Sequence, residues 1–171
     1  MTGNPLKVRD KCWRSNPPRL DSLRRTGLSL FLAGIFNRRL DQFERFLASR
    51  TPKYVMFDIT WCGGLTEARK ISTMADAYQL PIAPHTAGGP LLFYATTHLT
   101  TASPNVWIQE SCQRFYERDW PAMLEAPIAP QNGAIQAPDE PGFGMKIKPE
   151  AWNHPAAVLS RQSRKFRFPA K

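Results

Sequence analysis

The sequence predicts an α/β fold with a parallel sheet, in which short buried strands alternate with amphipathic helices. Two observations support this prediction. Four short apolar runs alternate with three helical patterns at about 25 residues per unit, and glycine or proline stands at most of the junctions. Two neighbouring parallel strands require a crossover connection, which is usually a right-handed one through a helix packed on the sheet.

The first strand and helix are predicted within residues 28–49. The apolar run over 28–33 ends at Gly34, as expected for a buried strand. A helix is predicted over 39–49, because its apolar residues recur with helical spacing, and Pro52 follows it closely. The apolar run over 54–59 predicts the second strand.

The same alternation continues to residue 110. A helix is predicted over 65–78 because its small and apolar residues share one face. The third strand, over 80–85, contains two prolines and is therefore expected to be short or irregular. Pro90 suits the first turn of the next helix, which should run to about residue 101, and a fourth strand is predicted over 106–110.

Outside this region the alternation is absent. We expect residues 1–27 to be an irregular basic segment and residues 151–171 a flexible basic tail. Residues 113–150 are rich in Pro, Gly and Ala and are predicted to be a loop-rich segment of the same domain as 28–112. Within it, Gln131-Asn132-Gly133 is typical of a hairpin turn.

The positive charge of the chain is concentrated at its two ends. The 171 residues contain 23 Lys and Arg against 14 Asp and Glu, which gives a formal net charge of +9. Residues 1–50 carry +7 and residues 151–171 carry +5, whereas residues 51–150 carry −3. Basic ends are more often solvated tails than nucleic-acid surfaces, so this distribution argues against nucleic-acid binding, which would need the charge on a folded face.

Composition also bears on location and on metal binding. No apolar run approaches the ~18–20 residues of a membrane span, and the first residues lack the apolar segment of a secretory signal. The three cysteines form no C-x-x-C pair, so neither a zinc knuckle nor a disulfide framework is indicated. We therefore expect a cytoplasmic protein with free thiols.

Three polar residues stand where the last predicted strands end: Asp58, His85 and Glu110. In parallel α/β proteins, functional groups gather at the carboxyl ends of the strands. Each separation is about one strand-helix unit, so the three side chains should meet at one edge. The structural alternative is that Asp58 caps a helix, His85 is a satisfied core residue and Glu110 pairs with a surface arginine.

An aspartate beside a histidine can support proton transfer. The carboxylate accepts the imidazole N–H, fixes the tautomer and stabilises the imidazolium ion. The other ring nitrogen is then available to take a proton from carbon or to give one to a departing hydroxyl. Glu110 could exchange a hydrogen bond across the same cavity.

Four motifs in this order resemble a known family. They are FDITWCGGLTEA at 57–68, APH at 83–85, IQES at 108–111 and PGFG at 141–144. Together they resemble the C-terminal part of the mandelate racemase/muconate-lactonizing branch of the enolase superfamily, and most closely its acid-sugar dehydratases. The resemblance covers about residues 28–150.

The resemblance implies a fold, a reaction and roles for the three residues. The fold would be a partial (β/α) TIM-type barrel over 28–112, containing the last three to four βα units. The reaction would be a hydro-lyase reaction on a galactonate- or gluconate-type sugar acid, by α-proton abstraction and loss of water. Asp58 would orient His85, His85 would be the general acid/base, and Glu110 would polarise the substrate, with Mg²⁺ holding the substrate carboxylate.

The sequence also departs from the family pattern at the metal ligands. Ile35 stands where a metal-binding Glu should follow the strand, and Ser15 stands at another ligand position. Isoleucine offers no oxygen to a hard cation, so the ligand set is not retained in this chain. A partial barrel would also leave strands unpaired, free to associate with a second copy or a partner. We therefore expect low or no activity in the chain alone; the alternative is a degenerate, non-enzymatic fragment or a partner-assembling module.

Overall fold

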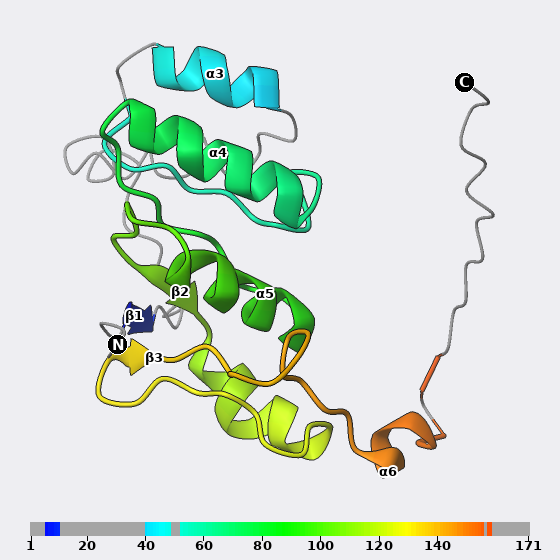
Figure 1. The fold of residues 1–171 in the computed structure, drawn as a ribbon. Helices are drawn as coiled ribbons and strands as arrows, with labels where there is room; N and C mark the ends of the chain where they lie inside the picture. Colours follow the sequence, from blue (N-terminus) through cyan, green and yellow to red (C-terminus); the bar gives the residue numbers. More distant parts are fainter. Residues whose placement is uncertain (1–5, 11–39, 49–51, 156, 159–171) are drawn as a thin grey trace, which may run out of the picture.

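The computed structural model describes residues 6–10, 40–48, 52–155 and 157–158. The helices and strands in chain order are β1 (Leu6–Asp10), α3 (Leu40–Ala48), α4 (Leu65–Ala77), α5 (Pro90–Thr101), β2 (Gln109–Ser111), β3 (Ala134–Ile135) and α6 (Pro149–Trp152) (Figure 1). A π-helical turn over Phe115–Asp119 and a 3-10 turn over Trp120–Ala122 follow β2. The described part is thus mostly helical with short strands.

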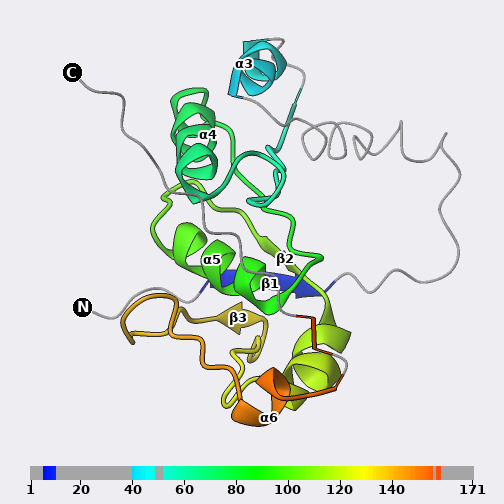
Figure 2. The ribbon, with the colours of Figure 1, turned by 90° about the vertical axis from the view of Figure 1, so that its right-hand side faces the viewer.

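The three long helices agree with the sequence prediction. We expected helices over 39–49, 65–78 and 90–101, and α3, α4 and α5 occupy these positions. They lie in chain order along the molecule, with α4 between the other two (Figures 1 and 2). The strand predicted over 28–33 lies outside the described residues.

The last three predicted strands appear as a parallel row held by single bridges. Val55 pairs with Ile82 and Ile82 pairs with Val106, both in parallel. The row continues toward its carboxyl end through a hydrogen bond from the His85 amide to the Phe57 carbonyl, with an N–O distance of 2.9 Å. The order and direction expected from the sequence are therefore present, in shortened form.

Proline explains why the middle member of this row is so short. Pro81 and Pro84 have no amide proton and cannot donate to a neighbouring strand. Their carbonyl groups still accept hydrogen bonds, from Val55 and Glu110 respectively. Only the segment around Ile82 can therefore pair in both directions, which confirms the prediction of an irregular strand.

The N-terminal segment contains a strand that the sequence analysis did not predict. We expected residues 1–27 to be irregular, but Leu6–Asp10 forms β1. It is the middle strand of a sheet with the order β2-β1-β3, parallel to β2 and antiparallel to β3 (Figure 2). The prediction failed because a strand of five residues depends on its partners, and these lie about a hundred residues further along the chain.

Two clusters of buried side chains form the core. The first joins α3, α4 and α5 to the parallel row and includes Phe43, Leu47, Val55, Phe57, Ile71, Ala75, Ile82 and Leu99. The second lies beneath the segment after β2 and includes Phe93, Tyr94, Tyr116, Trp120, Leu124 and Ile135. Phe143 packs against both clusters and so links the C-terminal segment to the helical part.

The loop-rich segment has the turn that its sequence predicts. Gln131 and Ala134 exchange both backbone hydrogen bonds, at 2.7 and 3.0 Å. Asn132 and Gly133 between them have φ values of 52° and 76°. Two central residues with positive φ define a type I′ turn, the tight hairpin turn that Asn-Gly favours.

The end of the described chain differs in one detail from the predicted tail. Residues 151 and 152 belong to α6, which begins at Pro149. Residues 159–171 lie outside the described part. Among the described helices, none has the length and apolar character that crossing a membrane requires.

Candidate functional site

The structure brings the three predicted residues together. Asp58, His85 and Glu110 follow the bridged positions of their segments by three or four residues. Because the three segments run parallel, their carboxyl ends coincide. The functional groups therefore meet at one edge of the row, as the spacing predicted.

His85 lies between the two carboxylates. Its Nδ1 atom is 2.9 Å from Asp58 Oδ2, and its Nε2 atom is 3.6 Å from Glu110 Oε2. The first distance is that of a hydrogen bond, whereas the second is within ion-pair range but too long for a hydrogen bond. With Nδ1–H donated to Asp58, Nε2 is the nitrogen available for proton transfer.

Asp58 is held by the turn that follows it. Its side chain is buried, and Oδ1 accepts hydrogen bonds from the backbone N–H of Thr60, at 2.7 Å, and from the Thr60 hydroxyl. Burial alone would raise the pKa of Asp58. The hydrogen bonds from His85 and Thr60 favour the carboxylate and outweigh burial, so the pKa lies below its usual range. Asp58 is therefore ionised when it binds the imidazole.

The environment of His85 favours its protonated form. The hydrogen bond to Asp58 raises the pKa of His85, burial opposes this, and the charge of Glu110 raises it further. The Trp61 ring lies across the imidazole, with 5.6 Å between ring centroids and 37° between planes. The Trp61 ring therefore covers one face of His85. Trp61 is itself 48% exposed, so its other side is open to solvent.

The backbone of Glu110 is fixed by hydrogen bonds, whereas its carboxylate is held less firmly. Its N–H donates to the carbonyl of Pro84 at 3.1 Å, and its carbonyl accepts a hydrogen bond from the Thr86 hydroxyl. Within the described part of the chain, the buried Oε2 atom has no hydrogen-bond partner. A buried carboxylate oxygen without a partner is costly, so this atom is suited to accept a hydrogen bond from a ligand.

Two residues that shape the site, Thr60 and Thr86, were not predicted from the sequence, and for Trp61 the sequence left pocket lining and core packing open. Thr60 follows Asp58 by two positions, and this spacing is typical of an Asx-type turn, so it carried a usable indication. Trp61 follows the Asp58 strand, a place that suits either a pocket residue or core packing, and the structure sets its ring against His85. The contact of Thr86 with the Glu110 carbonyl joins segments 24 residues apart and had no sequence indication.

The described residues do not fit a magnesium site. Mg²⁺ requires several oxygen ligands in octahedral arrangement. Among the residues that the structure describes, no group of three or more His, Cys, Asp or Glu could hold a metal ion. Both oxygens of Asp58 are already engaged. Ser15 and Ile35, where the sequence departs from the family ligands, lie outside the described residues.

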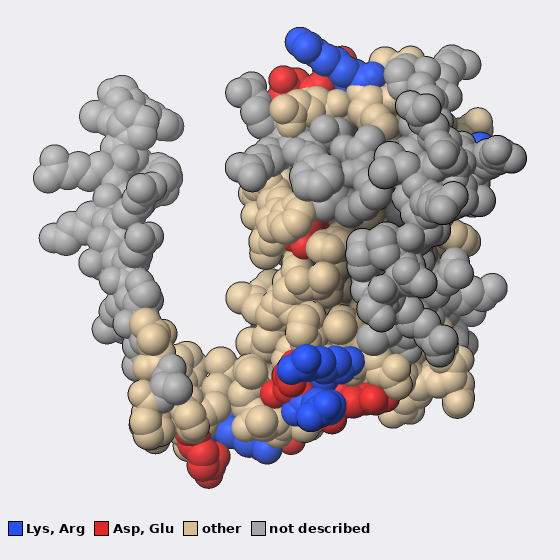
Figure 3. All heavy atoms as spheres, turned by 180° about the vertical axis from the view of Figure 1, so that it is seen from behind, with Lys and Arg blue, Asp and Glu red and all other residues tan. Residues whose placement is uncertain are grey.

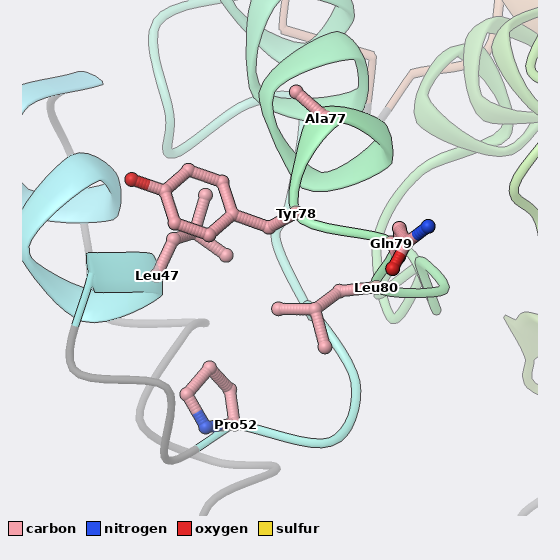
Figure 4. A pocket seen from close by; sticks show the side chains of 6 residues that line it. All are labelled: Leu47, Pro52, Ala77, Tyr78, Gln79 and Leu80. Carbon is pink, nitrogen blue, oxygen red and sulfur yellow. The ribbon is translucent and has the colours of Figure 1, made fainter.

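A separate cavity lies away from these groups. It has a volume of about 390 Å³ and lies beside the C-terminal ends of α3 and α4, where Tyr78 and Leu80 line it together with Leu47 and Pro52 (Figure 4). Leu80 is at the amino end of the segment that ends at His85. The cavity is therefore at the opposite end of the row from the carboxylates.

Comparisons with known proteins place this arrangement in a family. The family model "Enolase C-terminal domain-like" matches residues 13–151. The L-rhamnonate dehydratase of Saccharopolyspora erythraea is 31% identical over 111 residues, covering 63% of this chain and 28% of the relative. The D-galactonate dehydratase of Ralstonia nicotianae is 32% identical over 111 residues, covering 62% and 29%. The chain thus spans less than a third of the length of these curated relatives.

Solved structures agree with the sequence relatives. A crystal structure of an enolase of the mandelate racemase subgroup from Agrobacterium tumefaciens is 40% identical, with a TM-score of 0.61, and the match covers 66% of this chain and 30% of that one. The resemblance inferred from the four motifs is confirmed. The chain belongs to the enolase C-terminal domain-like family, in its mandelate racemase/muconate-lactonizing subgroup, and is distantly related to acid-sugar dehydratases.

Proposed function

We propose that the chain carries the acid/base edge of an acid-sugar dehydratase site in a partial (β/α) barrel, with His85 as the proton carrier. In the reaction, neutral His85 Nε2 would take the proton α to a sugar-acid carboxylate and then give it to the β-hydroxyl, which leaves as water while the electron pair of the α-carbon forms the carbon–carbon double bond. The observation that carries this proposal is the position of His85, with Nδ1 bound to Asp58 and Nε2 facing Glu110.

The charge state of His85 suits the elimination step. Because Asp58 and Glu110 both favour the imidazolium, His85 holds a proton at Nε2 that it can give to a departing hydroxyl. The β-carbon–oxygen bond then breaks and water leaves. Asp58 acts as a positioning residue, since it holds the ring by Nδ1 and compensates the positive charge.

Glu110 and Trp61 would contact the substrate around His85. The Oε2 atom of Glu110, which has no hydrogen-bond partner among the described residues, can accept a hydrogen bond from a substrate hydroxyl. Mg²⁺, which the family resemblance implies, would supply positive charge to a substrate carboxylate. The described residues offer no set of ligands for this ion.

The proposal is tested by product formation. The chain is incubated with galactonate, gluconate, rhamnonate or arabinonate and Mg²⁺, and the 2-keto-3-deoxy acid is followed by mass spectrometry over hours. We expect slow turnover of at least one acid, reduced at least ~100-fold in His85→Asn, because general acid–base catalysis typically contributes 10²–10⁴-fold.

His154→Asn is the matched control, because it removes an exposed histidine outside the site. It should leave turnover unchanged. Turnover that survives His85→Asn contradicts the assignment of the proton carrier. A chain that neither dehydrates nor binds any of the four acids, judged by the NMR signals of His85, contradicts the proposed function.

A partner-assembling module remains the second candidate, and one observation favours it. The ring of Trp107 stacks on that of Tyr54, with centroids 4.3 Å apart, yet Trp107 is 40% exposed. Exposed aromatic surface of this kind is typical of interfaces. Light scattering distinguishes the candidates, since a mass above the 19.4 kDa of one chain supports assembly and a monomer contradicts it.

A further inference from the structure

We infer that Gln109 is a positioning residue of this site: its buried amide binds α5 and thereby directs the next side chain, Glu110, toward His85. The inference deepens the proposed function and rests on it for its chemical meaning. The geometry that carries it involves no substrate.

Gln109 is bound at both ends of its amide. Oε1 accepts a hydrogen bond from the Thr100 hydroxyl at 2.9 Å, and Nε2 donates to the Thr97 hydroxyl oxygen at 3.1 Å. The Thr97 hydroxyl in turn donates to the carbonyl of Phe93 at 2.8 Å. Gln109, Thr97 and Thr100 are all 0% exposed, so no solvent competes for these hydrogen bonds.

The strand transmits this anchoring to the neighbouring residue. Successive side chains of a strand point to opposite faces, and β2 is accordingly buried at Gln109 and Ser111 and half-buried at Glu110. Because the amide of Gln109 faces α5, the Glu110 side chain must leave the strand on the site face. There its Oε2 atom lies 3.6 Å from His85 Nε2.

An apolar side chain of similar size would fill the same volume without fixing direction. Without the Gln109 amide, the Thr97 hydroxyl keeps its hydrogen bond to the carbonyl of Phe93, and the Thr100 hydroxyl can donate instead to the carbonyl of Thr97, 3.0 Å away. Gln109→Leu should therefore be tolerated by the helix. It removes the two directional contacts that oppose rotation of β2, so Glu110 can move away from His85.

The pKa of His85, followed by NMR of its imidazole C–H groups across pH, reports this movement. Among the described residues, the carboxylates that face His85 are those of Asp58 and Glu110, and only the second is displaced. We expect Gln109→Leu to lower the pKa of His85 in the same direction as Glu110→Gln, because the negative charge that favours the imidazolium is withdrawn. In the double variant that combines Gln109→Leu with Glu110→Gln, we expect the pKa of His85 to fall no further than in Glu110→Gln alone.

Thr97→Val is a second variant, which keeps Gln109 but removes the acceptor of its amide. It should lower the pKa of His85 as well, by less than Gln109→Leu. Thr101→Val is the matched control, because its hydroxyl binds the carbonyl of Thr97 in the same helix rather than Gln109. It should leave the pKa unchanged.

An unchanged pKa of His85 in the folded Gln109→Leu variant overturns the inference. It is also overturned if the falls in this pKa caused by Gln109→Leu and Glu110→Gln add fully in the double variant. If Gln109→Leu does not fold, Thr97→Val decides the matter by the same measurement. The measurement needs no substrate. Absent sugar-acid chemistry would therefore count against the proposed function alone, and an unchanged pKa against Gln109 alone.

Discussion

At the scale of single residues, the spacing along the sequence was enough to predict that Asp58, His85 and Glu110 lie close together. The three lie at the carboxyl ends of parallel segments, and that placement follows from the alternation of strands and helices. The hydrogen bonds that orient these side chains were harder to predict from the sequence. Thr60 could have been found from its spacing to Asp58, whereas the hydrogen bonds of Gln109 depend on how α5 packs against β2, which no local pattern encodes.

The Asp58–His85 pair should make stability depend on pH. The lowered pKa of Asp58 stabilises the fold above its usual 3.8, and this contribution is lost as pH falls through the folded pKa. The raised pKa of His85 also stabilises the fold. This contribution to stability is fully present below the usual pKa of 6.5 and is lost as pH rises through the pKa of the folded chain. The combined contribution is therefore largest between pH 3.8 and 6.5.

Asp58→Asn tests this dependence through the free energy of unfolding in urea. We expect it to cost more stability at about pH 5, where His85 is charged in both folded and unfolded chains, than at about pH 9, where a smaller fraction of the rings is charged. Asp76→Asn, at an exposed position of α4, is the control and should cost little at either pH. An equal cost of Asp58→Asn at both values would show that the ion pair does not contribute.

At the scale of elements, helices were predicted well and strands poorly. The apolar faces of α3, α4 and α5 repeat with helical period, which a single sequence displays. Strands depend on distant partners. Proline reduced one predicted strand to a bridge at Ile82, and β1 appeared where the pattern suggested none.

The loop around Phe143 allows a matched comparison of two glycines. Gly144 has a φ of +67°, and a Cβ atom there would lie 2.4 Å from Pro138 Cβ. Gly133 has a similar φ of +76°, and apart from its chain neighbours no heavy atom of the described residues lies within 4 Å of a Cβ atom placed there. Gly133→Ala should cost about 1–2 kcal/mol of unfolding free energy from backbone strain alone. Gly144→Ala should cost about 1–3 kcal/mol more, because a neighbour must move.

Thermal and urea unfolding of the two variants measure this difference. The loop carries Phe143, whose carbonyl accepts a hydrogen bond from His98 Nε2 at 3.2 Å. If both alanine variants lose the same stability, Pro138 is free to shift, and the loop is looser than the described contacts indicate.

At the scale of the whole molecule, charge is unevenly divided. Residues 51–150 carry −3, although the chain carries +9. On the face of the molecule that Figure 3 shows, the described Lys and Arg side chains lie beside Asp and Glu and form no continuous basic patch. Phosphate binding by a folded domain needs such a face.

We therefore expect no DNA association at about 0.15 M salt, where a few phosphate contacts are strongly weakened. Fluorescence anisotropy with a labelled duplex measures this, with the chain ending at residue 158 as the control for the basic tail. Binding that falls steeply with salt and is lost in the shortened chain would show that the tail is a nucleic-acid segment.

The central place of β1 in its sheet has a consequence for synthesis on the ribosome. Its two partners, β2 and β3, are translated long after it, since Asp10 precedes Ile135 by 125 residues. At translation rates of about 5–20 residues per second, β1 waits roughly 6–25 s before its sheet can close. During that interval the nascent chain exposes an unpaired strand, so chaperone occupancy should be greatest before residue 135 has emerged.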